Sequence, residues 1–386
     1  MAAMQHLTAW TVIALVVTTA CDRRARPEMD DAPAFDAPVV TESLKHADSL
    51  PLWTLGPAPL TRLQGSESDD NYDLYDAWDI VRLSNGVLVL APQGGPVRLY
   101  GANGKHLRTV GRRGQGPGEF GQIVQIGRIR GDTIVTFDNE LGRISVLSPQ
   151  GDFVRSHRSD PLIGQTLGGF TQDGHFIGEH SASLRATDAV SRDRVTLVSR
   201  NPESGEATPI VAIPGAWMTA VGQVPFSPSP RTAIAGRRIY ATSADKYDIL
   251  VFEDNKPLHS IRIEISCIPV TTTDVRKWVE NSSSLGDDEA TTRYVEQVRD
   301  KAAKCHGQVN RMLTDGAGRL WVRPSSRVTS QPDRWLIHGP DGRLIARFEG
   351  SGSTIRAVGP DHVITSTSSD EGIPAVIEVW PLQRPH

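Results

Sequence analysis

A four-strand unit that recurs about every 45 residues constrains the fold of this chain more than any other sequence feature. At residues 77–110, an alternating segment, a glycine turn and a continuous apolar segment precede a further pair of strands joined by Asn103-Gly104. An Asn-Gly pair between alternating segments is a strong signal for a β-hairpin. The same order of segments recurs at residues 123–154 and 309–348. The chain is therefore predicted to consist of repeated β-sheets.

The spacing of the repeats predicts the number of sheets. The units start near Ala77, Ile123, Thr166, Val221, Val309 and Thr354, which gives steps of 46, 43, 55, 88 and 45 residues. A period of about 40–50 residues with four strands is typical of a β-propeller blade. The last unit has room for only three strands, and residues 52–63 can supply the fourth beside residues 376–380, which removes exposed sheet edges.

We therefore predict an all-β fold, a six-bladed β-propeller of four-stranded blades closed by the N- and C-terminal strands. It would occupy residues 51–386 as one domain. The third unit, residues 167–213, matches the repeat poorly, so the sequence leaves open whether its blade is complete.

Composition supports a folded chain and excludes some functions. The 386 residues are 38% hydrophobic and 22% charged, which is sufficient for a core and excludes global disorder. Lys and Arg number 41 against 45 Asp and Glu, a formal net charge of −4. Nucleic-acid-binding proteins normally carry a strong basic excess. We therefore expect no nucleic-acid partner.

The N-terminus has the features of an export signal. The apolar run at residues 7–20 is too short for a membrane span, which needs about 20 residues, but it fits a secretory signal peptide. No Lys or Arg precedes it, which leaves a membrane anchor as the alternative. We predict a signal peptide at residues 1–21, followed by a flexible tether at residues 22–50 that is charged and rich in Pro and Ala.

Residues 17–21, Val-Thr-Thr-Ala-Cys, resemble the lipobox of bacterial lipoproteins, in which the cysteine receives diacylglycerol. Thr18 departs from the leucine that usually occupies its position. The resemblance implies lipidation of Cys21, and with it an exported protein in the cell envelope or periplasm, held at a membrane by its N-terminal lipid.

The other two cysteines bracket the longest step in the repeat. In an exported chain, Cys267 and Cys305 are most simply a disulfide, although two buried free thiols are an alternative and a metal site is the least favoured. Between them, residues 271–307 predict a two-helix insertion. Val275, Trp278 and Val279 have helical spacing, Thr272 or Thr273 can cap the first helix, and residues 294–302 suggest a second.

The repeats and one loop resemble a known family. Residues 111–120, Gly-Arg-Arg-Gly-Gln-Gly-Pro-Gly-Glu-Phe, are similar to a loop of the bacterial six-bladed β-propeller lipoproteins with NHL-type repeats. The resemblance implies an exported scaffold; many members of the family have no assigned activity.

The same loop also matches G-x-G-x-x-G, but a strand follows it where a dinucleotide site needs a helix. We expect it to cross between blades, with Glu119 accepting hydrogen bonds from loop amides and Phe120 packing between two sheets.

No catalytic motif is present, neither G-x-S-x-G nor a P-loop. Asp79, Gln125 and Arg311 are polar positions on predicted inner strands, where they would line a central channel. Trp278, on the insertion, would belong to a binding face if it is exposed. These four are the candidate binding residues.

We predict a monomeric scaffold that needs no cofactor and binds an envelope protein or a small ligand. The alternative is a metal-dependent hydrolase, lactonase or lyase with its site in the channel, because some six-bladed relatives are enzymes of this kind. A purely structural or sensory module also remains open.

Overall fold

The computed structural model describes residues 34–66, 68–74, 79–92, 95–158, 167–181, 191–219, 222–282, 291–292, 295–296, 299, 302–325, 333–350, 352–368 and 374–385. The predicted signal peptide and Cys21 lie outside these residues. Within the described ranges, none of the helices has the length and apolar character needed to cross a bilayer.

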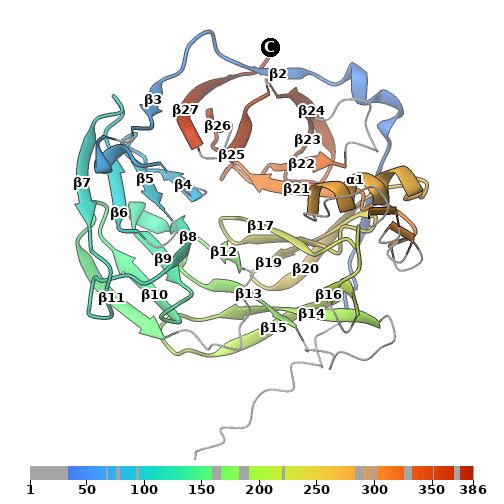
Figure 1. Cartoon of the computed structure of the whole chain (residues 1–386), viewed down its shortest axis with the longest axis horizontal. Helices are drawn as coiled ribbons and strands as arrows, with labels where there is room; N and C mark the ends of the chain where they lie inside the picture. The colour runs from blue at the N-terminus through green and yellow to red at the C-terminus, as the bar shows by residue number, and fades with distance from the viewer. Residues whose placement is uncertain are drawn as a thin grey trace, which may run out of the picture.

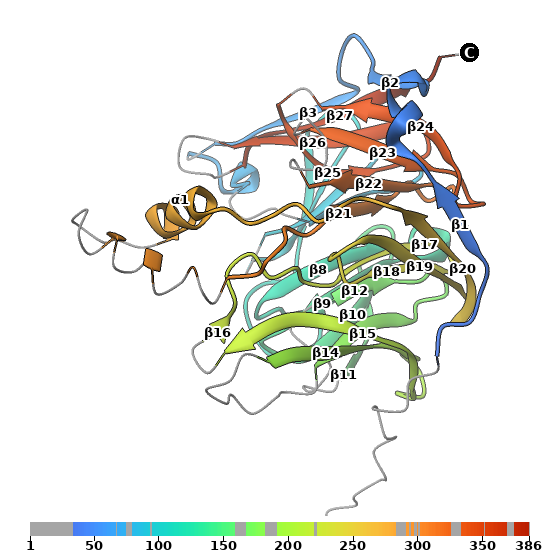
Figure 2. The same ribbon diagram turned by 90° about the vertical axis from the view of Figure 1, so that its right-hand side faces the viewer.

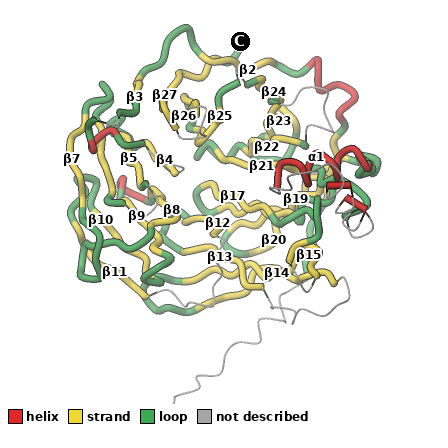
Figure 3. Tube along the Cα trace, viewed as in Figure 1, coloured by secondary structure: helices red, strands yellow, loops and turns green. Residues whose placement is uncertain are grey.

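The described chain is all-β with few helices, and its sheets are arranged around a centre as in a propeller (Figure 1). The helical elements are α1 (Thr272–Ser282) and the short 3-10 helices η1 (Leu44–Ser49), η2 (Asp70–Tyr72) and η3 (Arg130–Asp132). In Figure 3 the ring itself is drawn as strand and loop, and α1 lies toward the right-hand side of the view.

The first two sheets are four-stranded antiparallel sheets. One contains β4 (Asp79–Arg82), β5 (Leu88–Ala91), β6 (Val97–Tyr100) and β7 (His106–Val110), and the next contains β8 (Ile123–Arg128), β9 (Ile134–Asp138), β10 (Arg143–Leu147) and β11 (Phe153–Arg158). Both match the sequence repeat because each glycine or Asn-Gly turn joins neighbouring strands.

Two five-stranded sheets follow. The third sheet contains β12 (Leu167–Phe170), β13 (Phe176–Ser181), β14 (Ser191–Arg200), β15 (Ala207–Thr219) and β16 (Gly222–Gln223). The fourth contains β17 (Arg231–Ala235), β18 (Arg238–Thr242), β19 (Tyr247–Glu253), β20 (Lys256–Ile263) and β1 (Val39–Glu42). The poorly matching third unit thus has a complete set of four strands and a short additional one.

The remaining strands form one continuous nine-stranded sheet. Its members are β21 (Val309–Thr314), β22 (Leu320–Pro324), β23 (Arg334–His338), β24 (Leu344–Glu349), β25 (Thr354–Val358), β26 (His362–Ser368), β27 (Pro374–Gln383), β2 (Leu52–Leu55) and β3 (Thr61–Gln64). β2 connects two antiparallel groups, because it pairs in parallel with β24 and antiparallel with β27.

The two ends of the chain meet in this sheet. β3 pairs antiparallel with β27, with Leu63 opposite Ile377 and Gln64 opposite Val376. The sequence predicted this pairing from the missing strand of the last unit. Around the centre, β4, β8, β12, β17, β21 and β25 contact one another in cyclic order, which makes them the inner strands of the ring (Figure 1).

The core lies between neighbouring sheets. Val89, Val97 and Leu99 of the first sheet pack against Ile126 and Leu147 of the second. This follows from the sequence, in which the middle strands are continuously apolar and are therefore buried on both faces. Burial of apolar surface at about 25 cal/mol per Å² is what holds the sheets against each other.

The crossing loop between the first two sheets is built as the sequence predicted. Phe120 is buried in the cluster between the two sheets. Glu119 Oε2 accepts the Gly116 N–H at 2.8 Å, and its Oε1 accepts Arg112 Nε at 2.8 Å. Gly111 has φ +78°, and a Cβ there would lie 2.5 Å from the Gly118 carbonyl oxygen. Only glycine fits this position without strain.

The N-terminal segment departs from the predicted tether. Within residues 34–50, β1 pairs in parallel with β20, and Phe35 stacks edge-on against Phe252 with ring centroids 5.3 Å apart. Ala47, in η1, is buried. The boundary expected at residue 50 therefore does not hold. β1 is held by backbone hydrogen bonds at a sheet edge and has little apolar surface, so no hydrophobic period marks it in the sequence.

The insertion projects from one face of the ring (Figure 2). α1 begins one residue after its cap: Thr271 Oγ1 accepts the Asp274 N–H at 3.2 Å, and Asp274 Oδ2 accepts the Thr271 N–H at 2.9 Å. This reciprocal pair is a capping box. The cap is thus Thr271, where the sequence suggested Thr272 or Thr273, because only Thr271 has an acid three residues later. Helical backbone recurs at residues 291–292, 295–296 and 299.

Candidate functional site

Three of the predicted polar residues lie on three inner strands. Asp79 begins β4, Gln125 lies in β8 and Arg311 lies in β21. Asp79 Oδ2 accepts the backbone N–H of Ile126, next to Gln125, at 2.6 Å. The charge of Arg311 acts on Asp79, and it lowers the pKa of that carboxyl against the larger effect of burial. The structure therefore brings Asp79 and Arg311 into electrostatic contact across the ring.

Burial dominates the ionisation of both groups. Desolvation raises the pKa of Asp79 to about 6, and it lowers the pKa of Arg311 to about 10, helped by repulsion from Arg356 and Arg323. Arg311 Nη1 donates to the Ile355 carbonyl at 2.6 Å. The guanidinium thus ties β21 to β25, so its donors serve the wall of the channel rather than a ligand.

A second acid with a raised pKa was not predicted from the sequence. Glu179, in β13, has its pKa raised to about 7 by desolvation, against weaker opposing effects of Thr232 and Arg231. Thr232 Oγ1 lies 3.4 Å from Glu179 Oε1. Glu179 lies in the second strand of the third sheet, in the segment Phe-Ile-Gly-Glu-His-Ser, and its partner Thr232 belongs to the inner strand β17. No local pattern in the sequence marks it.

Gln125 faces the neighbouring inner strand. A Cβ on Gly169 would lie 3.4 Å from Gln125 Nε2. Its Oε1 is buried and has no hydrogen-bond partner among the described residues. A buried acceptor of this kind can take a donor from a bound molecule or water.

The ends of the inner strands surround a cavity of about 670 Å³, which we call the channel mouth. Its lining carries the acids Asp132, Asp315 and Asp361, and each is engaged. Asp132 accepts a hydrogen bond from the Ser84 N–H, and its Oδ1 lies 3.5 Å from Arg128 Nη1. Asp315 forms an ion pair with Arg319, and Asp361 Oδ1 lies 2.7 Å from His362 Nδ1. These three carboxylates therefore hold the turns of the mouth together.

Trp278 packs the insertion onto the body. Its ring centroid lies 6.4 Å from that of Phe226, and the side chain is half-buried against Val275, Val279 and Val295. Most of its environment is thus the small core of the insertion.

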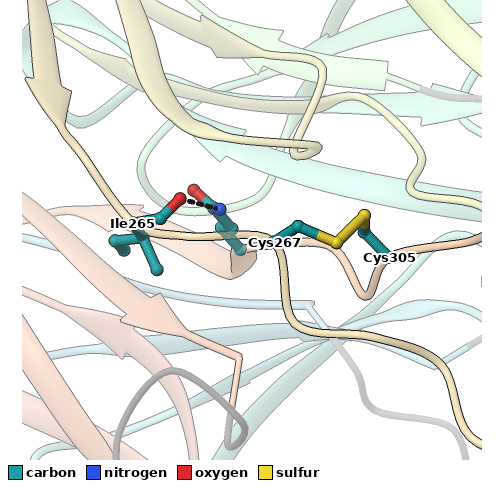
Figure 4. The surroundings of a disulfide bond; sticks show 4 residues. Ile265, Cys267 and Cys305 are labelled. Carbon is teal, nitrogen blue, oxygen red and sulfur yellow. Dashed lines mark hydrogen bonds between the residues drawn. A yellow bond between two sulfur atoms is a disulfide. The ribbon is translucent and has the colours of Figure 1, made fainter.

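A second cavity, of about 630 Å³, lies between the insertion and the main body, and we call it the insertion pocket. Its described lining is Arg192, Trp217, Val224, Pro228, Asp245, Lys246, Ile265, Cys267, Ala302–His306 and Gln308. Cys267 and Cys305 form a disulfide with Cα atoms 5.6 Å apart, and Ile265 lies near it (Figure 4). Sequence reasoning identified the disulfide but not the cavity beside it.

The alternative of a channel metal enzyme needs converging ligands. Among the described residues, no three His, Cys, Asp or Glu side chains come together in a set that could hold a metal ion. Asp79 and Glu179 lie on different sheets and each has its own neighbours.

Comparisons with known proteins place the chain by fold alone. No protein-family model matches it, and no curated protein does so either. The resemblance to NHL-type propeller lipoproteins therefore stays a prediction. Among solved structures, the chain is similar to a Bacteroides fragilis protein assigned as exported, with a TM-score of 0.50 and 12% identity over 91% of this chain and all of the other.

Two weaker structural similarities accompany it. A member of the DUF4221 family from Bacteroides vulgatus has a TM-score of 0.49 and 10% identity, over 87% of this chain and all of the other. Virginiamycin B lyase from Staphylococcus aureus has a TM-score of 0.42 and 8% identity, over 85% of this chain and 99% of the other. Because these two TM-scores are below 0.5, only the first similarity bears on the fold.

Proposed function

We propose that this protein is an exported, lipid-anchored six-bladed β-propeller that acts as a binding scaffold in the cell envelope. The cyclic contacts of the six inner strands support the blade count, with the nine-stranded sheet counted as two blades connected by β2. A crystal structure with another number of blades would contradict it. The similarity to an exported protein of the same fold agrees with the predicted signal peptide.

One observation carries the choice of binding face. The Cys267–Cys305 bridge joins the two ends of the insertion, and the insertion is held against the body where the Ala303 N–H donates to the Pro225 carbonyl at 3.0 Å. A fixed elaboration on one face of a rigid scaffold is where propeller proteins carry binding. The partner is an envelope protein or a small ligand.

The test compares two variants in pull-downs from envelope extracts. In one, residues 268–304 are replaced by a short Gly-Ser linker and both cysteines by serine. The matched control carries only Cys267→Ser and Cys305→Ser. We expect the deletion to lose partners of the full chain, and the control, in which the other contacts still hold the insertion, to bind the same partners more weakly. Identical partners for both would remove the insertion from the binding face.

Lipid anchoring is tested separately. Globomycin, which blocks cleavage of lipoprotein signal peptides, should leave a larger precursor. An unchanged mature size would contradict lipidation at Cys21.

A further inference from the structure

The interior of the insertion pocket is lined largely by apolar side chains. Trp217, Val224, Pro228 and Ile265 line it together with the disulfide. Trp217 is a large apolar side chain that is 36% exposed, on a strand whose other apolar residues are largely buried. The volume of about 630 Å³ lies within the range of small-molecule sites, about 300–1,000 Å³.

The walls of this pocket are fixed before any ligand arrives. Gln308 is buried in its floor, where Nε2 donates to the Ile265 carbonyl at 2.9 Å and Oε1 accepts the Tyr247 N–H at 2.8 Å. The Ala303 N–H donates to the Pro225 carbonyl at 3.0 Å, and the disulfide closes the same side. A preformed site loses little conformational entropy when it binds.

Positively charged side chains outnumber negatively charged ones around the pocket. Arg192 pairs with Asp245 and lies over the Trp217 ring at 5.3 Å, so this cation is already balanced. Lys246 and Lys304 are exposed at the rim, and neither forms an ion pair with any acid in the described part of the chain. Beside this apolar cavity, therefore, stand two cations that pair with none of the acids the structure describes.

We propose that the insertion pocket binds a small amphipathic anion. The apolar chain or ring of this ligand lies against Trp217, Ile265 and the disulfide, and its carboxylate, sulfate or phosphate group lies between Lys246 and Lys304. The inference deepens the proposed function and rests on it for the binding face.

The test measures the binding of three probes to the full chain by calorimetry. Cys21→Ser is included so that no lipid is attached and no detergent is needed. The probes are laurate below its micelle concentration, dodecyltrimethylammonium, which has the same tail and the opposite charge, and acetate, which has the head group alone. We expect laurate to bind about tenfold more tightly than dodecyltrimethylammonium. Acetate should give no measurable heat.

Variants separate the two parts of the site. Lys246→Glu with Lys304→Glu should weaken laurate binding about tenfold and remove the preference for an anion. The matched control, Lys105→Glu with Lys256→Glu, reverses two exposed lysines outside the pocket and should leave it unchanged. Trp217→Ala should weaken laurate binding about tenfold, whereas Trp217→Phe keeps a ring and should retain most of it.

Several results would overturn the proposal. Equal binding of both twelve-carbon probes, or laurate binding that neither the lysine nor the Trp217 variants change, would do so. Binding to phosphatidylglycerol vesicles without binding of monomeric laurate would indicate a membrane surface instead. If laurate does not bind but the pull-down still finds partners that depend on the insertion, the amphipathic anion is rejected as the ligand and the proposed function stands.

Discussion

The channel and the insertion pocket both contain charged side chains, but these side chains have different partners in the two regions. In the channel, Arg311 is bonded to backbone carbonyls, and in the mouth Asp315 pairs with Arg319. In the insertion pocket, Lys246 and Lys304 are exposed and lie beside apolar walls. Buried charges that are fully engaged maintain a fold, whereas exposed charges beside a preformed apolar cavity are available to a ligand.

Of all the substitutions considered, removal of the disulfide beside the insertion pocket should lower the free energy of unfolding most. Replacing Cys267 and Cys305 by serine opens a 38-residue separation and should lower the free energy of unfolding by roughly 3–4 kcal/mol on the chain-entropy model. Urea denaturation measures the loss. Laurate binding should fall with it, while the channel mouth, which the bridge does not touch, keeps its turns. Unchanged stability would mean that the insertion is held by its other contacts.

Removing the charge of Asp315 from the channel mouth should cause the next largest loss of unfolding free energy. Asp315 is 1% exposed and accepts the backbone N–H groups of Ala317 and Arg319 at 3.0 and 3.2 Å. Asp315→Asn should cost about 1.5–3 kcal/mol of unfolding free energy, because a buried charged acceptor is lost.

Asp341→Asn is the matched control for this change. It lies in a similar Asp-Gly turn, but its side chain is 64% exposed. Its effect should stay within about 0.5 kcal/mol. Equal losses for the two variants would show that the turn, not the buried charge, matters at position 315.

The partly buried acid Glu179 should give a pH dependence of stability. The pKa of Glu179 is raised from 4.5 to about 7, so the folded chain holds this proton over a range where the unfolded chain has released it. Stability contributed by the protonated carboxyl is therefore present below pH 4.5 and declines as pH rises through about 7.

Glu179→Gln isolates this group from the other acids. At pH 8 the variant should be more stable than the parent chain by about 1–3 kcal/mol, and at pH 4 the two should be equal. Thermal or urea unfolding at both pH values measures the difference. A variant that is less stable at pH 8 would mean that ionised Glu179 is stabilised by Arg231 more than burial disfavours it.

Substitution of the lysines at the rim of the insertion pocket should have the smallest effect on the free energy of unfolding. Lys246→Ala and Lys304→Ala should each change the free energy of unfolding by no more than about 0.5 kcal/mol, because both side chains are exposed. Urea unfolding at the same pH as the binding measurements is the check. A large loss for either would make that lysine a structural residue and weaken the contrast with the channel.

The local sequence pattern predicted the strands, the turns that join them and the strand pairing that closes the ring. Asn-Gly and Asp-Gly turns between alternating segments identified the strands, and the missing strand of the last unit predicted the pairing of Leu63 with Ile377. Glu119 and Phe120 perform the predicted roles in the crossing loop. Strand periodicity and turn residues act over a few positions, so they can be read without the tertiary structure.

Other features depend on contacts between distant segments. β1 pairs with the edge strand β20, and Glu179 of β13 meets Thr232 of β17 in the neighbouring sheet. The insertion pocket joins Arg192, Trp217, Lys246, Ile265 and Lys304 from five separate segments. No spacing along the chain relates these residues, because their proximity is set by how the third and fourth sheets and the insertion pack together. The sequence by itself determined the repeating β-sheets and the closure of the ring and favoured the disulfide, whereas tertiary packing decided where a cavity remains and which charges border it.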